Sequence, residues 1–231
     1  MTLRILVADD HEIVRRGLCS LLQARAGWEI CGEAADGREA VDKAEQLRPD
    51  VVVLDVGMPG LNGLEATHQI LKANPKAKIL VLTLYDTDQV VREVLNAGAR
   101  GFLLKSDAAR DLVEAVDALQ RGKTYFTPTV SALVLDAYLN RDNRATVLPK
   151  DDRLTPRERE VVQLVAEGKS TKEVAVALGL SVKTAETHRS NVMRKLDIHS
   201  VSDLVLYAVR NSIVYVTPEL RAESGPEPSA A

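Results

Sequence analysis

The sequence predicts a doubly wound α/β domain with a five-stranded parallel sheet, followed by a small all-α domain of four helices. Through residue 121, five short apolar runs alternate with five amphipathic stretches, which is the pattern of a parallel α/β sheet. Runs such as VVVL and ILVL show no polar alternation, so these strands should be covered on both faces. Residues 153–214 have helical patterns only. We therefore divide the chain into 1–121, a linker at 122–152, a helical domain at 153–214 and a tail at 215–231.

The β/α units of the first domain follow one another in order. Right-handed crossovers place the first and last helices on one face of the sheet and the middle helices on the other. The expected strands are RILVAD, EICGEA, VVVLD, ILVLT and GFLLK. The expected helices are IVRRGLCSLLQA, REAVDKAEQL, LEATHQILKA, QVVREVLNAG and ARDLVEAVDALQ.

Turn and capping residues mark the linker and the second domain. TPTVSALVLDAYLN predicts one helix after Pro128, and NRATVLPKDD is an exposed connector. Pro156 takes a first helical position, and Ser181 is an N-cap candidate. The polar, Pro-rich tail is expected to be disordered. Three further helix starts match the capping box or its acidic variant: Thr155 with Glu158, Ser170 with Glu173, and Ser200 with Asp203.

Charge and cysteine content limit the function classes. The net charge of −3 hides an asymmetry: residues 1–121 carry −4 and residues 153–214 carry +3, which suggests different partners for the two halves. No apolar run approaches the roughly 18 residues of a membrane span, and the start lacks a signal-peptide pattern, so we expect a cytoplasmic protein with no membrane contact. Cys19 and Cys31 match no metal or disulfide spacing. Buried free thiols are favoured over a redox role.

Functional groups gather where the predicted strands end. Asp9 and Asp10 follow the first strand, and Asp55, Thr83 and Lys105 end three others. Parallel strands bring these carboxyl ends to one rim. A cluster of carboxylates suits a hard divalent cation such as Mg²⁺, which relieves their mutual repulsion. The alternative, that each acid is a helix cap or a solvated loop residue, explains one position better than it explains four.

Residues 1–121 resemble the receiver domain of two-component response regulators, a flavodoxin-like fold. The resemblance is carried by the DD pair at 9–10, VVVLDVGMPGLNG at 51–63, LT at 82–83 and GFLLK at 101–105. It implies that Asp55 accepts a phosphoryl group from a phosphohistidine of a sensor histidine kinase. It also implies roles for the neighbouring groups: Mg²⁺ would be bound by Asp10, Asp55 and the carbonyl of Gly57, with Asp9 acting through water, while Lys105 and Thr83 would contact phosphoryl oxygens.

Three positions near this rim leave alternatives open. Phe102 would change rotamer with Thr83, or be an ordinary core aromatic. Ser106 stands where many receivers have proline, which leaves the switch geometry less determined than the chemistry. His11 could act as a general base, although a helix-start residue lining the pocket is the favoured interpretation.

Residues 173–196 predict a helix-turn-helix, with a sharp turn at Leu178-Gly179-Leu180. The alternative is a helical hairpin with a packing role only. The expected buried side is Val174, Ala175, Leu178, Leu180, Val182, Ala185, Val192 and Leu196. The expected outward side is Lys183, Thr184, Glu186, Thr187, His188, Ser190, Asn191, Arg194 and Lys195.

Residues 154–214 resemble the LuxR-type DNA-binding domain, and the whole chain resembles the NarL/FixJ family. The resemblance implies that Glu186, Thr187 and Ser190 face base edges. It places another set nearer the phosphates or the groove wall: Lys183, Thr184, His188, Asn191 and Lys195. The last helix, about 201–211, would be a dimer surface, or core packing for Leu204, Val205 and Ala208.

These observations predict a transcriptional response regulator rather than an enzyme of metabolism. Phosphorylation of Asp55 would free the helical domain and favour a homodimer on a two-half-site operator, with RNA polymerase as a further partner. One alternative is a constitutive DNA-binding regulator whose receiver is not phosphorylated in use. Another is a Mg²⁺-dependent phosphohydrolase, but Gly57 stands where that chemistry requires a second acid.

Overall fold

The computed structural model describes residues 2–85, 87–128, 130–132 and 154–215. Its first part is a five-stranded sheet whose strands all pair in parallel, in the order β2-β1-β3-β4-β5. This confirms the doubly wound fold. The strands are β1 (Leu3–Ala8), β2 (Trp28–Ala34), β3 (Val51–Asp55), β4 (Lys78–Thr83) and β5 (Gly101–Leu104).

Five helices cover the sheet on the two faces that the crossover rule predicts. Leu18 and Leu22 of α1 share one apolar cluster with Leu112 of α5. Ala40 of α2 and Ile70 of α3 belong to the cluster on the other face, with residues of α4. The helices are α1 (Glu12–Gln23), α2 (Gly37–Leu47), α3 (Gly63–Ala73), α4 (Asp88–Asn96) and α5 (Ala108–Gln120), and a short 3-10 turn, η1 (Lys105–Asp107), precedes α5.

Burial along the strands follows their position in the sheet. Every residue of β3 is buried, as the unbroken run VVVLD predicts for a central strand covered on both faces. β2 lies at the sheet edge and is mostly half-buried. Cys31 on β2 is therefore only partly buried, whereas Cys19 on α1 is buried as expected, and burial raises the pKa of its thiol to about 11.

The second part contains four helices around their own apolar core: α7 (Pro156–Ala166), α8 (Thr171–Ala177), α9 (Val182–Leu196) and α10 (Val201–Arg210). The capping boxes at Thr155 and Ser170 are both formed, and Ser181 and Ser200 cap α9 and α10. Gly179 adopts φ +61° in the turn between α8 and α9, a conformation that costs glycine little.

One position of the predicted core is wrong. Val182 is 41 % exposed, because it is the first residue of α9 and lies at the end of the helix, where the core covers it less than it covers Ala185. Leu180 is half-buried against the same core. The other predicted core positions of the helix-turn-helix are buried: Val174, Ala175, Leu178, Ala185, Val192 and Leu196.

Most of the predicted linker helix, residues 133–152 and the tail after residue 215 lie outside the described residues. None of the helices in the described part has the length and apolar character needed to span a bilayer.

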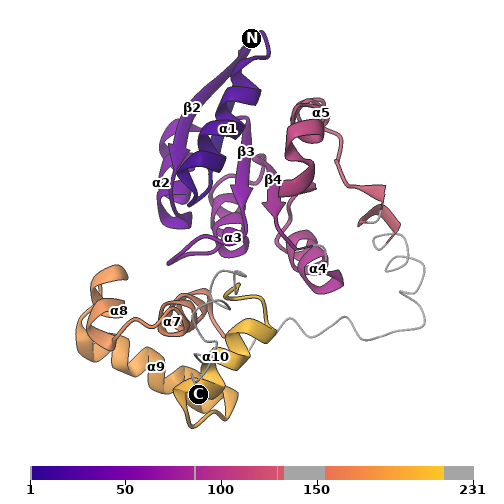
Figure 1. The fold of residues 1–231 in the computed structure, drawn as a ribbon. Coiled ribbons are helices and arrows are strands. Elements are labelled where there is room, and N and C mark those ends of the chain that lie inside the picture. Colours follow the sequence, from indigo (N-terminus) through magenta and orange to yellow (C-terminus); the bar gives the residue numbers. More distant parts are fainter. Residues whose placement is uncertain (1, 86, 129, 133–153, 216–231) are drawn as a thin grey trace, which may run out of the picture.

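The two parts meet through α7 and the chain after α10. Figure 1 shows α7 and α10 beneath the ends of α3 and α4, with α8 and α9 turned away from the sheet. Hydrogen bonds join the loop between β3 and α3 to α7, and Gln89 of α4 donates to the carbonyl of Arg210. The face of the sheet domain that carries the strand ends is therefore next to the helical domain.

Candidate functional site

The fold brings the predicted rim residues together at the carboxyl ends of neighbouring strands. Asp9 follows β1, Asp55 ends β3, Thr83 ends β4 and Lys105 follows β5. β1 and β4 both pair with β3, so their ends lie on either side of Asp55. The chain then turns back sharply: a Cβ on Gly63 would lie 2.0 Å from the carbonyl oxygen of Asp55, so only glycine fits there.

Lys105 joins two buried carboxylates in this pocket. Its Nζ lies 2.8 Å from Asp9 Oδ2 and 2.9 Å from Asp55 Oδ2. Burial raises the pKa of Asp55, as does the charge of Asp9, while Lys105 opposes the shift. Burial would lower the pKa of Lys105, but the carboxylates of Asp55 and Asp9 raise it. Lys105 therefore remains charged and neutralises much of the repulsion between the two acids.

The acids also form a group suited to a cation. Ligand atoms of Asp9, Asp10, His11 and Asp55 all lie within 4.8 Å of one another. Carboxylate oxygens at this spacing match the donor preference of a hard divalent ion such as Mg²⁺. Asp9 is fully buried, whereas the Asp10 side chain is 27 % exposed, so Asp10 offers the more accessible oxygens. The peptide N–H of Gly57 donates to Asp55, and metal binding by its carbonyl stays a prediction.

His11 sits at the start of α1, where the sequence favoured a helix-start residue. Its peptide N–H donates to Asp9 Oδ1 at 2.9 Å, and its Nδ1 lies 2.7 Å from Asp10 Oδ1. As the N-cap of α1 it makes no side-chain capping bond. Its ring therefore lies against the Asp10 carboxylate, and both sequence interpretations of His11 stay predictions.

The two predicted switch residues have different surroundings. Thr83 is buried, and its Oγ1 accepts the peptide N–H of Tyr85 at 3.0 Å, which leaves the hydroxyl hydrogen for another acceptor. Phe102 is 1 % exposed in the core cluster beneath α2, α3 and α4. Its packing supports the alternative of an ordinary core aromatic, and a rotamer change stays a prediction.

The outward side of α9 is open to solvent although the receiver packs on the same domain. His188 and Asn191 are half-buried. Lys183 lies 3.8 Å from Glu186, and the hydroxyl of Thr187 donates to the carbonyl of Lys183 within the helix. The remaining predicted contact residues are exposed: Lys183, Thr184, Glu186, Thr187, Ser190, Arg194 and Lys195.

Two features of the helical domain were not predicted from the sequence. Lys195 pairs with Glu158 of α7, with 2.7 Å between Nζ and Oε2, and its contact with a DNA phosphate stays a prediction. Arg189 is half-buried and donates to Thr171 Oγ1 at the start of α8. The two pairs each join different helices, across 37 and 18 positions of the chain, and no local pattern signals them.

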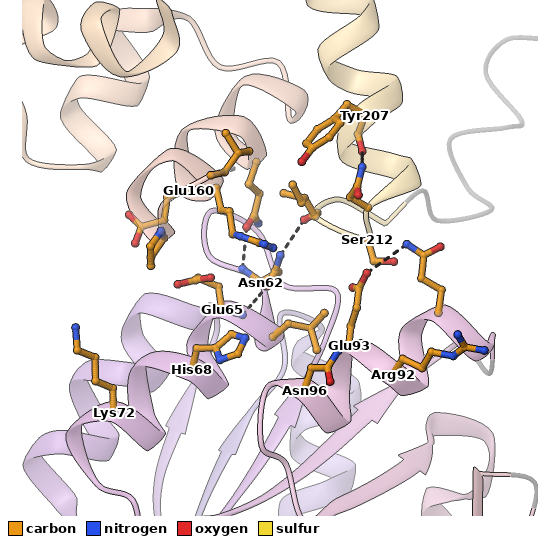
Figure 2. Close-up of a pocket in the computed structure, with 18 of the residues that line it drawn as sticks. Asn62, Glu65, His68, Lys72, Arg92, Glu93, Asn96, Glu160, Tyr207 and Ser212 are labelled. Atoms are coloured by element: carbon orange, nitrogen blue, oxygen red, sulfur yellow. Dashed lines mark hydrogen bonds between the residues drawn. The ribbon is translucent and has the colours of Figure 1, made fainter. Parts of the chain in front are cut away.

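A cavity of about 810 Å³ lies between the two domains. Figure 2 shows Asn62, Glu65 and Glu93 of the receiver facing Glu160, Tyr207 and Ser212 of the helical domain across it. Glu160 is buried and accepts bonds from Arg38 of α2 and Gln69 of α3, so receiver side chains enclose a charge of α7. No local pattern in the sequence signals this interface, because its members come from five helices, the loop before α3 and the chain after α10.

The parallel sheet with its acid pocket, joined to a helix-turn-helix, defines a two-domain regulator. Residues 5–117 match the family model described as "Response regulator receiver domain", and residues 152–208 match "Bacterial regulatory proteins, luxR family". The chain is 38 % identical to the response regulator protein VraR of Staphylococcus aureus over 214 residues, which is 93 % of this chain and all of that protein. It belongs to the two-component response regulators that carry a LuxR-type DNA-binding domain.

Solved structures agree with this assignment. The RcsB response regulator of Salmonella typhimurium is similar with 31 % identity and a TM-score of 0.54, covering 89 % of this chain and 97 % of that one. The structure of an RcsB–DNA complex is similar with 30 % identity and a TM-score of 0.54, covering 90 % and 98 %. The predicted resemblance to receivers and to LuxR-type regulators is thus confirmed.

Proposed function

We propose that the chain is a transcriptional regulator switched by Mg²⁺-dependent phosphorylation of Asp55. The observation that carries the proposal is the contact of Lys105 Nζ with both Asp55 and Asp9, at the end of a strand where Asp10 also contributes oxygens. A sensor histidine kinase is the proposed donor, because the chain belongs to a family whose receivers act with such kinases.

The chemistry requires positioning and charge neutralisation rather than a strong nucleophile. An oxygen of the Asp55 carboxylate forms a bond to phosphorus as the bond from phosphorus to the donor imidazole breaks, and the imidazole nitrogen keeps the electron pair. Lys105 lies beside the attacking carboxylate and balances charge on a phosphoryl oxygen. The Thr83 hydroxyl has a hydrogen to donate to another phosphoryl oxygen. Bound Mg²⁺, held by Asp10, Asp55 and the Gly57 carbonyl, would supply further neutralisation, with Asp9 oriented by Lys105.

DNA is the proposed target of α9. Its outward residues are exposed, and the similar protein RcsB has been solved in complex with DNA. A second RcsB structure contains two dimers bound to two parallel DNAs. Exposed Val201, Leu206 and Val209 leave part of α10 unpartnered, while Leu204 and Ala208 pack inside the domain. This division supports a homodimer formed through the exposed side of α10.

The test is selection of genomic DNA fragments by the purified full-length chain, with and without acetyl phosphate and Mg²⁺. Asp55→Asn is the matched control, since it keeps the size of the side chain and removes the nucleophilic carboxylate. Enrichment of a two-half-site sequence that requires both the phosphodonor and Asp55 would support the proposal.

Equal enrichment in all samples would favour constitutive DNA binding. The exposure of α9 in the presence of the receiver is the observation that keeps this second function open. Absence of any enrichment would contradict both.

A further inference from the structure

Gln163 of α7 and Glu167, which follows α7, form hydrogen bonds with the loop after Asp55. We call this loop, residues 56–62, the acceptor loop. Gln163 is 3 % exposed, and its amide bonds this loop twice. Its Oε1 accepts the peptide N–H of Asn62 at 2.9 Å, and its Nε2 donates to the carbonyl of Met58 at 3.1 Å. A buried amide satisfied by two backbone groups fixes their relative position, because losing either bond leaves a polar group unpaired.

Glu167 extends this contact. Its carboxylate oxygens accept the peptide N–H of Gly60 at 3.0 and 3.2 Å, and one of them accepts from Gln163 Nε2 at 2.8 Å. Asn62 returns a bond by donating from Nδ2 to the carbonyl of Ile213 at 3.0 Å, while its Oδ1 caps α3. Met58, Gly60 and Asn62 of the acceptor loop are therefore all hydrogen-bonded to the helical domain.

The other side of the acceptor loop is tied to the phosphoacceptor. The peptide N–H of Gly57 donates to Asp55, and Gly63 N–H donates to the carbonyl of Val56 at 3.0 Å. Asp55 is 4 % exposed, and Met58 and Leu61 are buried within the loop. A phosphoryl group on Asp55 adds charge and volume next to Gly57, so the acceptor loop has to adjust to it.

We propose that Gln163 and Glu167 are positioning residues for the acceptor loop: they hold it in the arrangement of the unphosphorylated receiver and thereby slow phosphorylation of Asp55. This inference rests on the proposed function of Asp55. A contact that phosphorylation weakens lowers the equilibrium extent of phosphorylation by the same free energy. It also slows the reaction, because the acceptor loop has to give way before the bond to phosphorus is complete.

This route differs from covering of α9 by the receiver. The hydrogen bonds of the receiver described above go to α7 and Glu167, to the last residue of α10 and to the chain after it, while Lys183 and Glu186 of α9 remain 87 % and 53 % exposed. Release of the acceptor loop would therefore weaken the attachment of the helical domain to the receiver. It would not change the exposure of α9 to DNA.

The interface also offers a matched control away from the acceptor loop. Arg38 of α2 lies 3.1 Å from Glu160 of α7, and its side chain is 43 % exposed. Arg157 also lies 2.7 Å from Glu160, so Glu160 keeps a partner when Arg38 is removed. Arg38→Ala thus weakens the contact between the domains without removing a bond to residues 56–62.

The experiment measures the rate of Asp55 phosphorylation by acetyl phosphate and Mg²⁺ in the full-length chain, by intact mass. We expect Gln163→Ala to raise the rate at least fivefold, because it removes both bonds from Gln163 to the acceptor loop and one hydrogen bond alone accounts for about fivefold. Glu167→Ala should raise it in the same direction and is half-buried, so it serves if Gln163→Ala does not fold. Arg38→Ala should stay close to the unmodified chain.

Each result decides a separate point. Equal acceleration by Arg38→Ala would overturn the loop assignment, because any weakening of the interface would then suffice. Unchanged rates in Gln163→Ala and Glu167→Ala, with the unmodified chain phosphorylated, would overturn the inference and leave the proposed function standing. No phosphorylation of the unmodified chain would overturn both.

Discussion

Lys195, on α9, forms an ion pair with Glu158, whose carboxylate completes the capping box of α7. Lys195 Nζ lies 2.7 Å from Glu158 Oε2, which also accepts the peptide N–H of Thr155. The Glu158 side chain is 5 % exposed and that of Lys195 is 36 % exposed. Although burial opposes the shift, Lys195 and Thr155 lower the pKa of Glu158. The end of α9 is thus fastened to the start of α7.

Lys195→Met should lower the stability of the helical domain, because it leaves the Glu158 carboxylate without its cation. A loss of about 1 kcal/mol is expected for a partly exposed pair. Urea unfolding followed by circular dichroism measures it, and Lys183→Met is the control, since Lys183 is 87 % exposed. Equal stability of the two variants would show that the pair is not stabilising.

Contacts to phosphate and to bases should separate along α9. Lys183→Ala should reduce the salt dependence of DNA binding by about 0.9 in the logarithmic slope, the value for one phosphate contact, without changing sequence preference. Thr187→Ala should change sequence preference and leave the slope alone. Binding titrations at several salt concentrations on a randomised site measure both. A shift of preference by both variants to the same extent would contradict the assignment.

Mg²⁺ should stabilise the receiver through Asp10. Binding to the folded chain alone adds about 1.4 kcal/mol at a concentration ten times the dissociation constant. Thermal unfolding should therefore move upward with Mg²⁺ in the unmodified chain, and Asp10→Asn should remove the response. High NaCl is the control for general ionic effects, and an undiminished Mg²⁺ response in Asp10→Asn would exclude this carboxylate as a ligand.

Contact between the domains should weaken as pH rises toward neutrality. Burial at the interface raises the pKa of Glu93 from 4.5 to about 7, while Gln89, Ser212 and Arg159 oppose the shift. A raised carboxyl pKa means that the closed form binds more protons than the open form, so closure loses free energy as pH rises from about 4.5 through 7. Tyr215 also faces Glu93 and remains protonated throughout this range.

Small-angle scattering of the full-length chain between pH 5 and 8 measures this opening. Glu93→Gln should keep the hydrogen bond to Gln89 and remove most of the pH dependence. If the radius of gyration changed with pH to the same extent in the unmodified protein and in Glu93→Gln, the titrating group would be a residue other than Glu93.

Short sequence patterns were sufficient to predict the strands and helices of both domains. The unbroken apolar run at 51–55 predicted a central strand, and the capping pairs at Thr155 and Ser170 predicted where α7 and α8 begin. The acid pocket could also be predicted from the sequence, because parallel strands must place Asp9, Asp55 and Lys105 at one edge of the sheet. Val182 was assigned to the buried side of α9, but as the first residue of that helix it is largely exposed.

In the part of the chain that the structure describes, the sequence by itself determined the strands and α-helices of the two folded parts, most of their buried positions and the rim to which the strand ends come, since periodicity and capping act over a few residues. Only the tertiary structure decided that Lys195 pairs with Glu158 and that Gln163 bonds the loop after Asp55. These contacts join residues 37 and about a hundred positions apart. They depend on how whole helices pack, which is fixed by shape and by the pairing of buried polar groups, and no short pattern in the chain encodes that.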